Sequence, residues 1–159
     1  QRKIYEDNFA YMLPVCLRYA TDESEAMDIL HEGFIKVYRH ISKYTPGTSL
    51  TAWIRRIMVN AAIDYYRKQS KRRTADLDTV YEMTDNEPDI ISQISADEIL
   101  KAMQKLTPSY RTVFNLYVVE GYSHREIAKE LGITESTSRS NLVKARGKLR
   151  AALQVMYKN

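Results

Sequence analysis

Apolar residues recur at intervals of three and four positions through most of the chain, which is the spacing of amphipathic α-helices. The first such stripe lies within residues 9–17. Asp22 and Glu25 have the spacing of a capping box, so we expect a second helix to begin after Asp22. The apolar stripe of this second helix consists of Ala26, Leu30, Phe34, Val37, Tyr38 and Ile41.

A third helix is predicted after a turn-forming loop at residues 43–49, which contains a Pro-Gly pair. Thr48 or Ser49 can cap this helix, which should run to about Lys71. One flank of the helix is apolar and consists of Leu50, Ile54, Ile57, Met58, Ala61 and Tyr65. Another flank is polar and consists of Arg56, Asn60, Asp64, Arg67 and Lys71, with Trp53 at the border between the two.

The last third of the chain contains several helix-start signals. Ser95 and Glu98 form a second capping box, and Thr107 followed by Pro108 is typical of another helix start. Gly121 is expected to end the helix that begins there. This part of the chain is therefore also predicted to be helical.

The two final helices are joined by a turn of three residues, 132–134, which contains a glycine. Ser123 and Glu126 cap the first of them, and the second is long. Two helices joined in this way are typical of a helix-turn-helix. The inner face of the long helix should consist of Ser138, Leu142, Ala145, Leu149, Ala152 and Met156.

Composition agrees with an all-α fold and excludes several classes of protein. The chain has 159 residues, only five Gly and four Pro, and 44% hydrophobic residues, which is enough for one large or two small cores. A single Cys excludes an intrachain disulfide framework, and no apolar run is long enough to span a bilayer. Since the chain shows no signal peptide, we expect a cytoplasmic protein.

Charge divides the chain into three parts. Residues 1–73 hold 13 basic and 8 acidic residues, and residues 99–159 hold 11 basic and 4 acidic ones. Residues 74–98 between them hold 8 acidic residues and no basic one. Two basic lobes indicate two contacts with a polyanion, and the acidic stretch is typical of a linker, although a solvated loop within one domain would also fit. We therefore predict helical domains at 1–73 and 94–159, joined by an acidic linker at 74–93.

The polar flank of the third helix has the residues that single-stranded nucleic acid requires. An aromatic ring can stack on a base while guanidinium groups hold phosphates. The alternative is that Trp53 is a core residue and the basic row is a solvated face. Candidate contacts on this flank are Trp53, Arg56, Asn60, Arg67 and Lys71.

The long helix of the helix-turn-helix is a candidate recognition helix for duplex DNA. Such a helix reads base edges with its N-terminal residues and holds phosphates with basic residues nearby. The alternative is an ordinary helical hairpin with a basic surface. The base-edge candidates are Ser136, Thr137, Arg139 and Ser140, and the phosphate candidates are Arg125, Lys144 and Arg146.

Catalytic chemistry is not indicated. The three His residues are separated, and the chain has no Ser/His/Asp set, no phosphate-binding loop and no metal-ligand spacing. Cys16 lies on an apolar stripe and should be buried and inert. We expect neither enzymatic activity nor a cofactor or metal.

Three stretches together resemble the extracytoplasmic-function group of bacterial sigma factors, which keep two conserved domains called region 2 and region 4. DILHEGF at 28–34 is similar to the D-x-x-Q-E-x-F signature of region 2. LTAWIRRIMVN at 50–60, continuing through Asp64 to Arg67, is similar to the F-x-x-W-L-x-x-I-x-x-N-x-x-x-D-x-x-R run. Residues 106–149 resemble the helix-turn-helix of region 4.

Three positions depart from the family pattern. His31 stands where the family usually has Gln, and Leu50 where it usually has Phe. Ser138 stands where Val or Ile usually packs. A buried Ser138 needs a hydrogen-bond partner, such as a backbone carbonyl one turn back, or it costs about 1–3 kcal/mol.

The resemblance implies a factor that binds core RNA polymerase and directs it to promoters. The second helix would dock on the polymerase through Asp28, His31, Glu32 and Phe34, although Phe34 also belongs to the apolar stripe and is more readily a core residue. The loop, through Lys43, Thr48 and Ser49, and the polar flank of the third helix would engage the −10 element. There the non-template strand is melted and a base is flipped into the protein. The helix-turn-helix would bind the −35 element, and the linker would lie in the RNA exit path.

The resemblance also implies an anti-sigma factor as a regulatory partner. A stand-alone helix-turn-helix repressor, which binds duplex DNA as a dimer, is the alternative. It would account for the C-terminal lobe and leave the polar flank of the third helix and the acidic stretch without a role.

Overall fold

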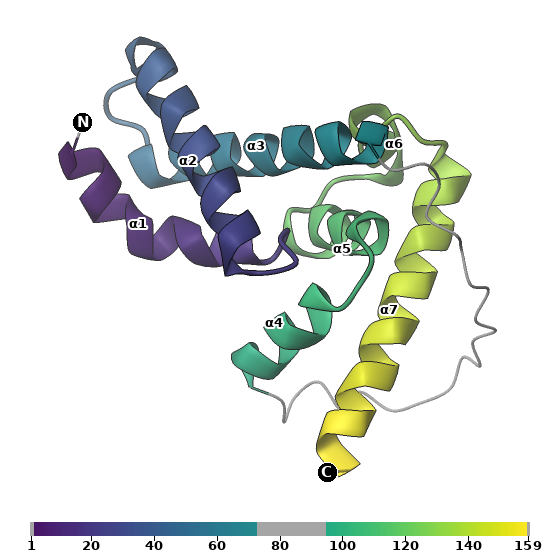
Figure 1. Ribbon diagram of the computed structural model, residues 1–159. Coiled ribbons are helices and arrows are strands. Elements are labelled where there is room, and N and C mark those ends of the chain that lie inside the picture. Colours follow the sequence, from purple (N-terminus) through teal and green to yellow (C-terminus); the bar gives the residue numbers. More distant parts are fainter. Residues whose placement is uncertain (1, 73–94, 159) are drawn as a thin grey trace. The chain divides into compact units, whose positions relative to one another are not determined.

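A computed structural model describes residues 2–72 and 95–158, and residues 1, 73–94 and 159 are outside the description. The chain divides into two compact units, Gln1–Arg72 and Arg73–Asn159 (Figure 1). Within the described ranges, all regular structure is helical, which confirms the predicted all-α class. The predicted acidic linker, 74–93, lies outside the described residues.

The N-terminal unit is built from three helices. These are α1 (Arg2–Leu17), α2 (Glu23–His40) and α3 (Leu50–Arg72), with a 3₁₀ turn, η1 (Ile41–Lys43), after α2. Each helix packs against the other two, and α3 makes its most extensive contact with α2 (Figure 1). The loop before α3 therefore begins one residue later than predicted, at Tyr44.

Local signals begin the second and third helices where the sequence predicts. The Asp22 carboxylate accepts a hydrogen bond from the Glu25 backbone N–H at 2.8 Å. The Ser49 hydroxyl accepts one from the Ala52 backbone N–H at 3.2 Å, so Ser49 rather than Thr48 caps α3. Each bond satisfies a backbone donor that the first helical turn leaves without a partner.

The core of the N-terminal unit contains most of the predicted apolar stripes and additional residues of α3. Phe34 is only 2% exposed, whereas Ile41, predicted for the same stripe, is 38% exposed because it lies in η1 beyond the end of α2. Since α3 packs against both α1 and α2, it is buried on a wider arc than the predicted flank. The buried residues of α3 are Ile54, Met58, Val59, Ala61, Ala62 and Ile63.

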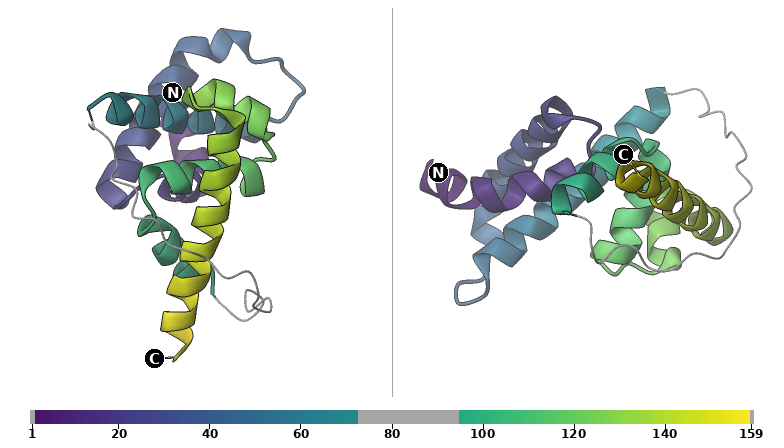
Figure 2. Two further views of the ribbon diagram at one scale, coloured as in Figure 1. Left: turned by 90° about the vertical axis from the view of Figure 1, so that its right-hand side faces the viewer. Right: turned by 90° about the horizontal axis from the view of Figure 1, so that it is seen from below.

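The C-terminal unit is arranged along one long helix. α4 (Ala96–Gln104), α5 (Pro108–Phe114) and α6 (His124–Leu131) all pack against α7 (Glu135–Lys158), and α5 continues into a π-helical turn, η3 (Asn115–Val119). Figure 2 shows α7 from two further sides. The main core cluster consists of Ala102, Met103, Leu106, Tyr110, Ala145, Leu149 and Leu153.

The predicted caps of this unit are confirmed. Ser95 and Glu98 make both bonds of a capping box. The Thr107 hydroxyl accepts from the Tyr110 N–H, with Pro108 at the first helical position. Gly121 follows the π-helical turn with φ of 75°, a left-handed conformation that glycine adopts without a steric cost.

A buried arginine ties α4 to α5. Arg111 is 1% exposed, and its guanidinium donates hydrogen bonds to the backbone carbonyls of Met103 at 3.2 Å, Gln104 at 3.4 Å and Leu106 at 2.8 Å. These carbonyls belong to the end of α4 and the turn after it, where helical partners run out. The apolar pattern of the sequence does not predict this side chain in the core.

Candidate nucleic-acid interface

The exposed face of α2 holds three of the four residues predicted to contact polymerase. Asp28, His31 and Glu32 are exposed. Phe34 is in the core, with its ring centroid 4.9 Å from that of Tyr5, so it is not available to a partner.

An apolar side chain that the sequence analysis did not select lies on the same face of α2. Ile35 is 43% exposed and is seven positions after Asp28. Positions 28, 31, 32 and 35 share one helical face, and this spacing is the signal that could have identified Ile35.

The loop before α3 is held by its own side chains. The Tyr44 hydroxyl donates to the Thr48 carbonyl, and the Thr48 hydroxyl donates to the Thr45 carbonyl at 2.7 Å. The Tyr44 ring lies 5.6 Å from the half-buried Trp53 ring, at an interplanar angle of 52°. Trp53 of α3 therefore packs against the loop through Tyr44. The hydroxyls of Thr48 and Ser49 already make hydrogen bonds within the protein.

The polar flank of α3 is exposed at four of its five predicted positions. Arg56, Asn60, Arg67 and Lys71 are all exposed. Asp64 of the same flank is half-buried, pairs with Lys36 of α2 and accepts a hydrogen bond from Arg67 at 3.3 Å. Asp64 thus links α3 to α2 and holds one arginine of the flank.

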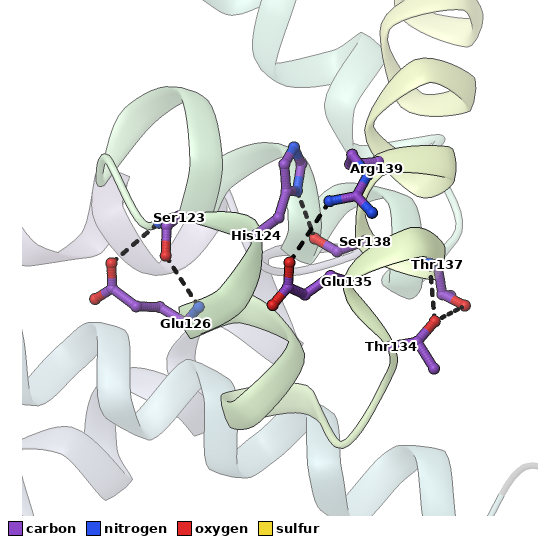
Figure 3. Close-up of polar contacts among 8 residues, drawn as sticks. All are labelled: Ser123, His124, Glu126, Thr134, Glu135, Thr137, Ser138 and Arg139. Atoms are coloured by element: carbon purple, nitrogen blue, oxygen red, sulfur yellow. Dashed lines mark hydrogen bonds and ion pairs between the residues drawn. The ribbon is translucent and has the colours of Figure 1, made fainter.

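The helix-turn-helix formed by α6 and α7 has the predicted geometry (Figure 3). Ser123 and Glu126 make both bonds of their capping box. Gly132 ends α6 with φ of 68°, and the Thr134 hydroxyl accepts from the Thr137 N–H at 3.0 Å to cap α7. A turn of three residues thus redirects the chain between two capped helices.

The outer face of α7 presents the predicted base-edge residues. Ser136, Thr137, Arg139 and Ser140 are exposed, and Thr137 also receives a hydrogen bond from the Thr134 hydroxyl at 2.8 Å. Arg139 pairs with Glu135 one turn earlier at 3.6 Å.

The remaining cations flank this face. Arg125 of α6 and Arg146 of α7 are exposed, and Lys144 is half-buried. Val143, which the sequence analysis did not select, is 58% exposed and lies seven positions after Ser136, on the same face as Arg139. The face is therefore basic and polar with one apolar side chain near its centre.

The departure at Ser138 has a specific solution that the sequence did not predict. Ser138 is 0% exposed, and its hydroxyl lies 2.8 Å from Nδ1 of His124 (Figure 3). The expected partner was a backbone carbonyl one turn back. In the structure the partner is instead a side chain of the preceding helix. No local spacing rule connects residues 14 positions apart, so the sequence carries no simple signal for this pair.

The surroundings of the His124 ring favour its neutral form. Burial lowers the pKa of His124 below its usual value of 6.5, and nearby Arg139 lowers it further. Glu135 raises the pKa and Arg146 lowers it. The ring also stacks on Tyr117, with centroids 4.4 Å apart and an interplanar angle of 17°.

No metal or reactive-thiol site is found in the described part of the chain. Among residues 2–72 and 95–158, no three His, Cys, Asp or Glu side chains come together in a way that could hold a metal ion. Burial raises the pKa of the Cys16 thiol to about 12, so it is a poor nucleophile at neutral pH. None of the helices in the described ranges is long and apolar enough to cross a membrane.

Comparison with known proteins gives two family matches in the order of the two units. Residues 4–72 match the family model for sigma-70 region 2, and residues 96–149 match that for sigma-70 region 4. The ECF RNA polymerase sigma factor SigM of Bacillus subtilis is 30% identical over 137 residues, which cover 85% of this chain and 83% of that protein.

Two further similarities extend the comparison. The ECF RNA polymerase sigma factor SigE of Mycolicibacterium smegmatis is 32% identical over 139 residues, which cover 84% of this chain and 53% of SigE, so the match extends over about half of that relative. Sigma factor RpoE of Bartonella quintana, solved in complex with the anti-sigma factor NepR, has a similar fold, with a TM-score of 0.54. At 22% identity, over 96% of this chain and 98% of that one, this similarity concerns the fold alone.

Proposed function

This chain belongs to the extracytoplasmic-function group of RNA polymerase sigma factors, and on that premise we propose that it binds core RNA polymerase and directs initiation to specific promoters. The observation that carries the proposal is the presence, in one chain and in this order, of a region 2 unit and a region 4 unit. A stand-alone repressor would need only the second of these. The alternative therefore leaves the whole N-terminal unit without a role.

Core polymerase binds the exposed face of α2 in this proposal. Asp28 and Glu32 give the face negative charge, His31 adds a polar group, and Ile35 adds an apolar one. An apolar side chain with polar residues around it fits the apolar core and polar rim of protein–protein interfaces. Phe34 supports this face from the core and does not contact the polymerase itself.

The −10 element is opened against α3. The basic residues of the polar flank, Arg56, Arg67 and Lys71, hold phosphates of the melted strand, while the half-buried Trp53 ring stacks on a base. Lys43 of η1 and Asn60 of α3 add polar contacts to the same strand. Thr48 and Ser49 hold the loop in shape through their own hydrogen bonds. We therefore assign them a supporting role, in which they position the loop beside the DNA.

The −35 element is read by α7. Arg139, Ser140 and Ser136 lie at the start of the helix, where a recognition helix meets base edges, and Thr137 stands beside them. Val143 can contact a thymine methyl group, the one apolar feature of the major groove. Arg125, Lys144 and Arg146 hold the flanking phosphates.

Regulation and the linker complete the proposal. Because Bartonella RpoE is solved with the anti-sigma factor NepR, an anti-sigma factor is the expected regulatory partner of this chain too. The acidic segment, 74–93, suits the RNA exit path of the polymerase, since its negative charge matches a channel built for RNA.

Selection of DNA by the assembled holoenzyme tests this proposal. Core polymerase, with and without the chain, is mixed with genomic fragments at fixed salt, and the retained DNA is sequenced. We expect the chain to enrich fragments that share two short elements at a constant separation. Enrichment of a single palindromic element, with or without polymerase, would favour the repressor instead.

A matched pair of variants assigns the two elements. Arg139→Ala should relax the sequence preference at the upstream element only, and Arg56→Ala should weaken retention with no change in the upstream element. Lys129→Ala, an exposed cation of α6 outside the proposed interface, is the control and should leave both elements unchanged. Loss of both elements in either variant would contradict the division of roles.

A further inference from the structure

The helix-turn-helix contains a buried hydroxyl at a position where an apolar side chain would pack without cost. Ser138 is 0% exposed and shares the inner face of α7 with Leu142 and Ala145, which are both buried. A hydroxyl in such surroundings loses its bonds to water, so it destabilises the folded unit unless another group bonds to it. The position of α7 therefore depends on the group that hydrogen-bonds to Ser138.

That group is the imidazole of His124, the first residue of α6. Its Nδ1 lies 2.8 Å from the Ser138 hydroxyl, and its ring lies nearly parallel to that of Tyr117, with centroids 4.4 Å apart. Tyr117 contacts one face of the imidazole, and Ser138 bonds to its edge. The ring cannot rotate without losing one of these contacts, so its orientation is fixed from two elements.

The recognition residues begin next to this bond. Arg139 follows Ser138 directly and is exposed, and its guanidinium is close enough to His124 to lower the pKa of the imidazole. Glu135, one turn before Arg139, pairs with it at 3.6 Å. A shift of α7 at Ser138 therefore moves the residues that face DNA by a similar amount.

We propose that His124 is a positioning residue for the recognition helix. Through its hydrogen bond to Ser138 it fixes the position of α7 against α6, and thereby the position of Arg139 and Ser140 relative to the base edges. This inference rests on the proposed −35 function of α7 and deepens it. His124 makes no base contact in this account. It acts on specificity through Ser138.

Substitutions at the pair separate this role from a general loss of folding. His124→Phe keeps an aromatic ring on Tyr117 and removes the bond, whereas His124→Asn keeps a polar atom near the Nδ1 position. The double variant His124→Phe, Ser138→Val replaces the polar pair by an apolar one. His40→Phe is the matched control, because His40 is exposed on α2 and belongs to no proposed site.

The measurement is base discrimination by the full chain in the holoenzyme. At one salt concentration, the affinity for a selected promoter is divided by that for the same promoter with transversions in the −35 element. His124→Phe should lower this ratio about tenfold, the loss expected when one good base contact is misplaced. His124→Asn and the double variant should restore most of the ratio, and His40→Phe should leave it unchanged.

A readout without DNA follows the bond itself. Nitrogen NMR of the free chain should show the His124 Nδ1 resonance shifting on Ser138→Ala, with the His40 resonances unchanged. Were His124→Phe to keep full discrimination, or His124→Asn to lose as much as His124→Phe, the positioning role would be overturned. A wild-type holoenzyme with no −35 preference would overturn the proposed function and this inference with it, whatever the NMR result.

Discussion

At the scale of single residues, Arg111 is a charged side chain that serves as a core component. It is 1% exposed, and its guanidinium bonds to three backbone carbonyls at the end of α4 and in the following turn. An arginine presents several donors in a fixed planar fork, so a single side chain can satisfy acceptors that lie close together. This position therefore needs the shape of arginine as well as its charge.

Arg111→Met should destabilise the C-terminal unit by about 3 kcal/mol, because the buried Leu106 carbonyl and the partly buried Gln104 carbonyl lose the guanidinium donor. Arg111→Lys should recover only part of this, since an ammonium group cannot span the three acceptors. Urea unfolding followed by far-UV circular dichroism measures the change. The fluorescence of Trp53, the single tryptophan, reports the N-terminal unit and should not shift. Equal stability of the wild type and Arg111→Met would contradict the assignment.

His124 should make the stability of the C-terminal unit depend on pH. Burial, together with Arg139 and Arg146 and against Glu135, lowers the pKa of His124 in the folded state below 6.5. The unfolded chain therefore takes up a proton first as the pH falls, and the unit is most stable above about pH 6.5 and loses stability below it.

The comparison of wild type with His124→Asn isolates this effect. Unfolding is followed by circular dichroism at about pH 7.5 and about pH 5.5, and carboxylates common to both proteins cancel in the difference. We expect the wild type to lose more stability than the variant on acidification, with the Trp53 signal falling equally in both. An equal loss in the circular dichroism transition would show that His124 does not carry a lowered pKa.

At the scale of elements, the contact between α2 and α3 depends on a glycine. A Cβ built on Gly33 would overlap Sδ of Met58, which is fully buried on α3. The absence of a side chain at Gly33 therefore lets the two helices approach, and Met58 fills the space. Gly33 lies in the same helix as the proposed polymerase contacts, so this packing also holds that face in place.

Gly33→Ala should cost about 1–3 kcal/mol, as overpacked cores do, even though alanine favours helices. Met58→Ala alone should also destabilise the unit by leaving a cavity. In the double variant the added methyl group occupies part of that cavity, so the double variant should lose less stability than the sum of the two single losses. Trp53 fluorescence during urea unfolding measures all three, and simple additivity would contradict the proposed contact.

Helix ends could be predicted from the sequence because their signals are local. Each signal involves residues only a few positions apart, and the structure has the hydrogen bond or the backbone angle that each implies. The signals are Ser95 with Glu98, Thr107 with Pro108, and Gly132. The order of the elements and the helix-turn-helix follow from these signals. The all-α class follows from the helical spacing of apolar residues between them.

Tertiary features could not be predicted in the same way. Val59 and Ile63 are buried because α3 has two helical neighbours, and a search for a single apolar stripe misses the second side. Arg111 is in the core because of acceptors on another helix, which its own helix does not indicate. His124 and Ser138 lie on different helices and are 14 positions apart in the sequence, so no spacing rule within one helix connects them. Each of these depends on a partner that only the fold supplies.

At the scale of the whole molecule, the charge distribution and the two-unit fold support the proposal of two separate contacts with nucleic acid. Basic residues gather in 1–73 and 99–159, and the acidic ones between them leave those lobes as the cationic parts of the chain. The described cations include the exposed rows of α3 and α7. A protein that reads one promoter at two places needs this arrangement, and a dimeric repressor does not.

Run-off transcription with core RNA polymerase tests this account most directly. Polymerase is supplied with the wild-type chain or with the variant Trp53→Ala, Arg67→Ala, on a promoter fragment chosen by the wild-type holoenzyme. We predict initiation at one start site with the wild type, and its loss in the variant while binding to the upstream element persists. No initiation with the wild-type chain, together with dimeric binding to duplex DNA without polymerase, would contradict the sigma-factor account.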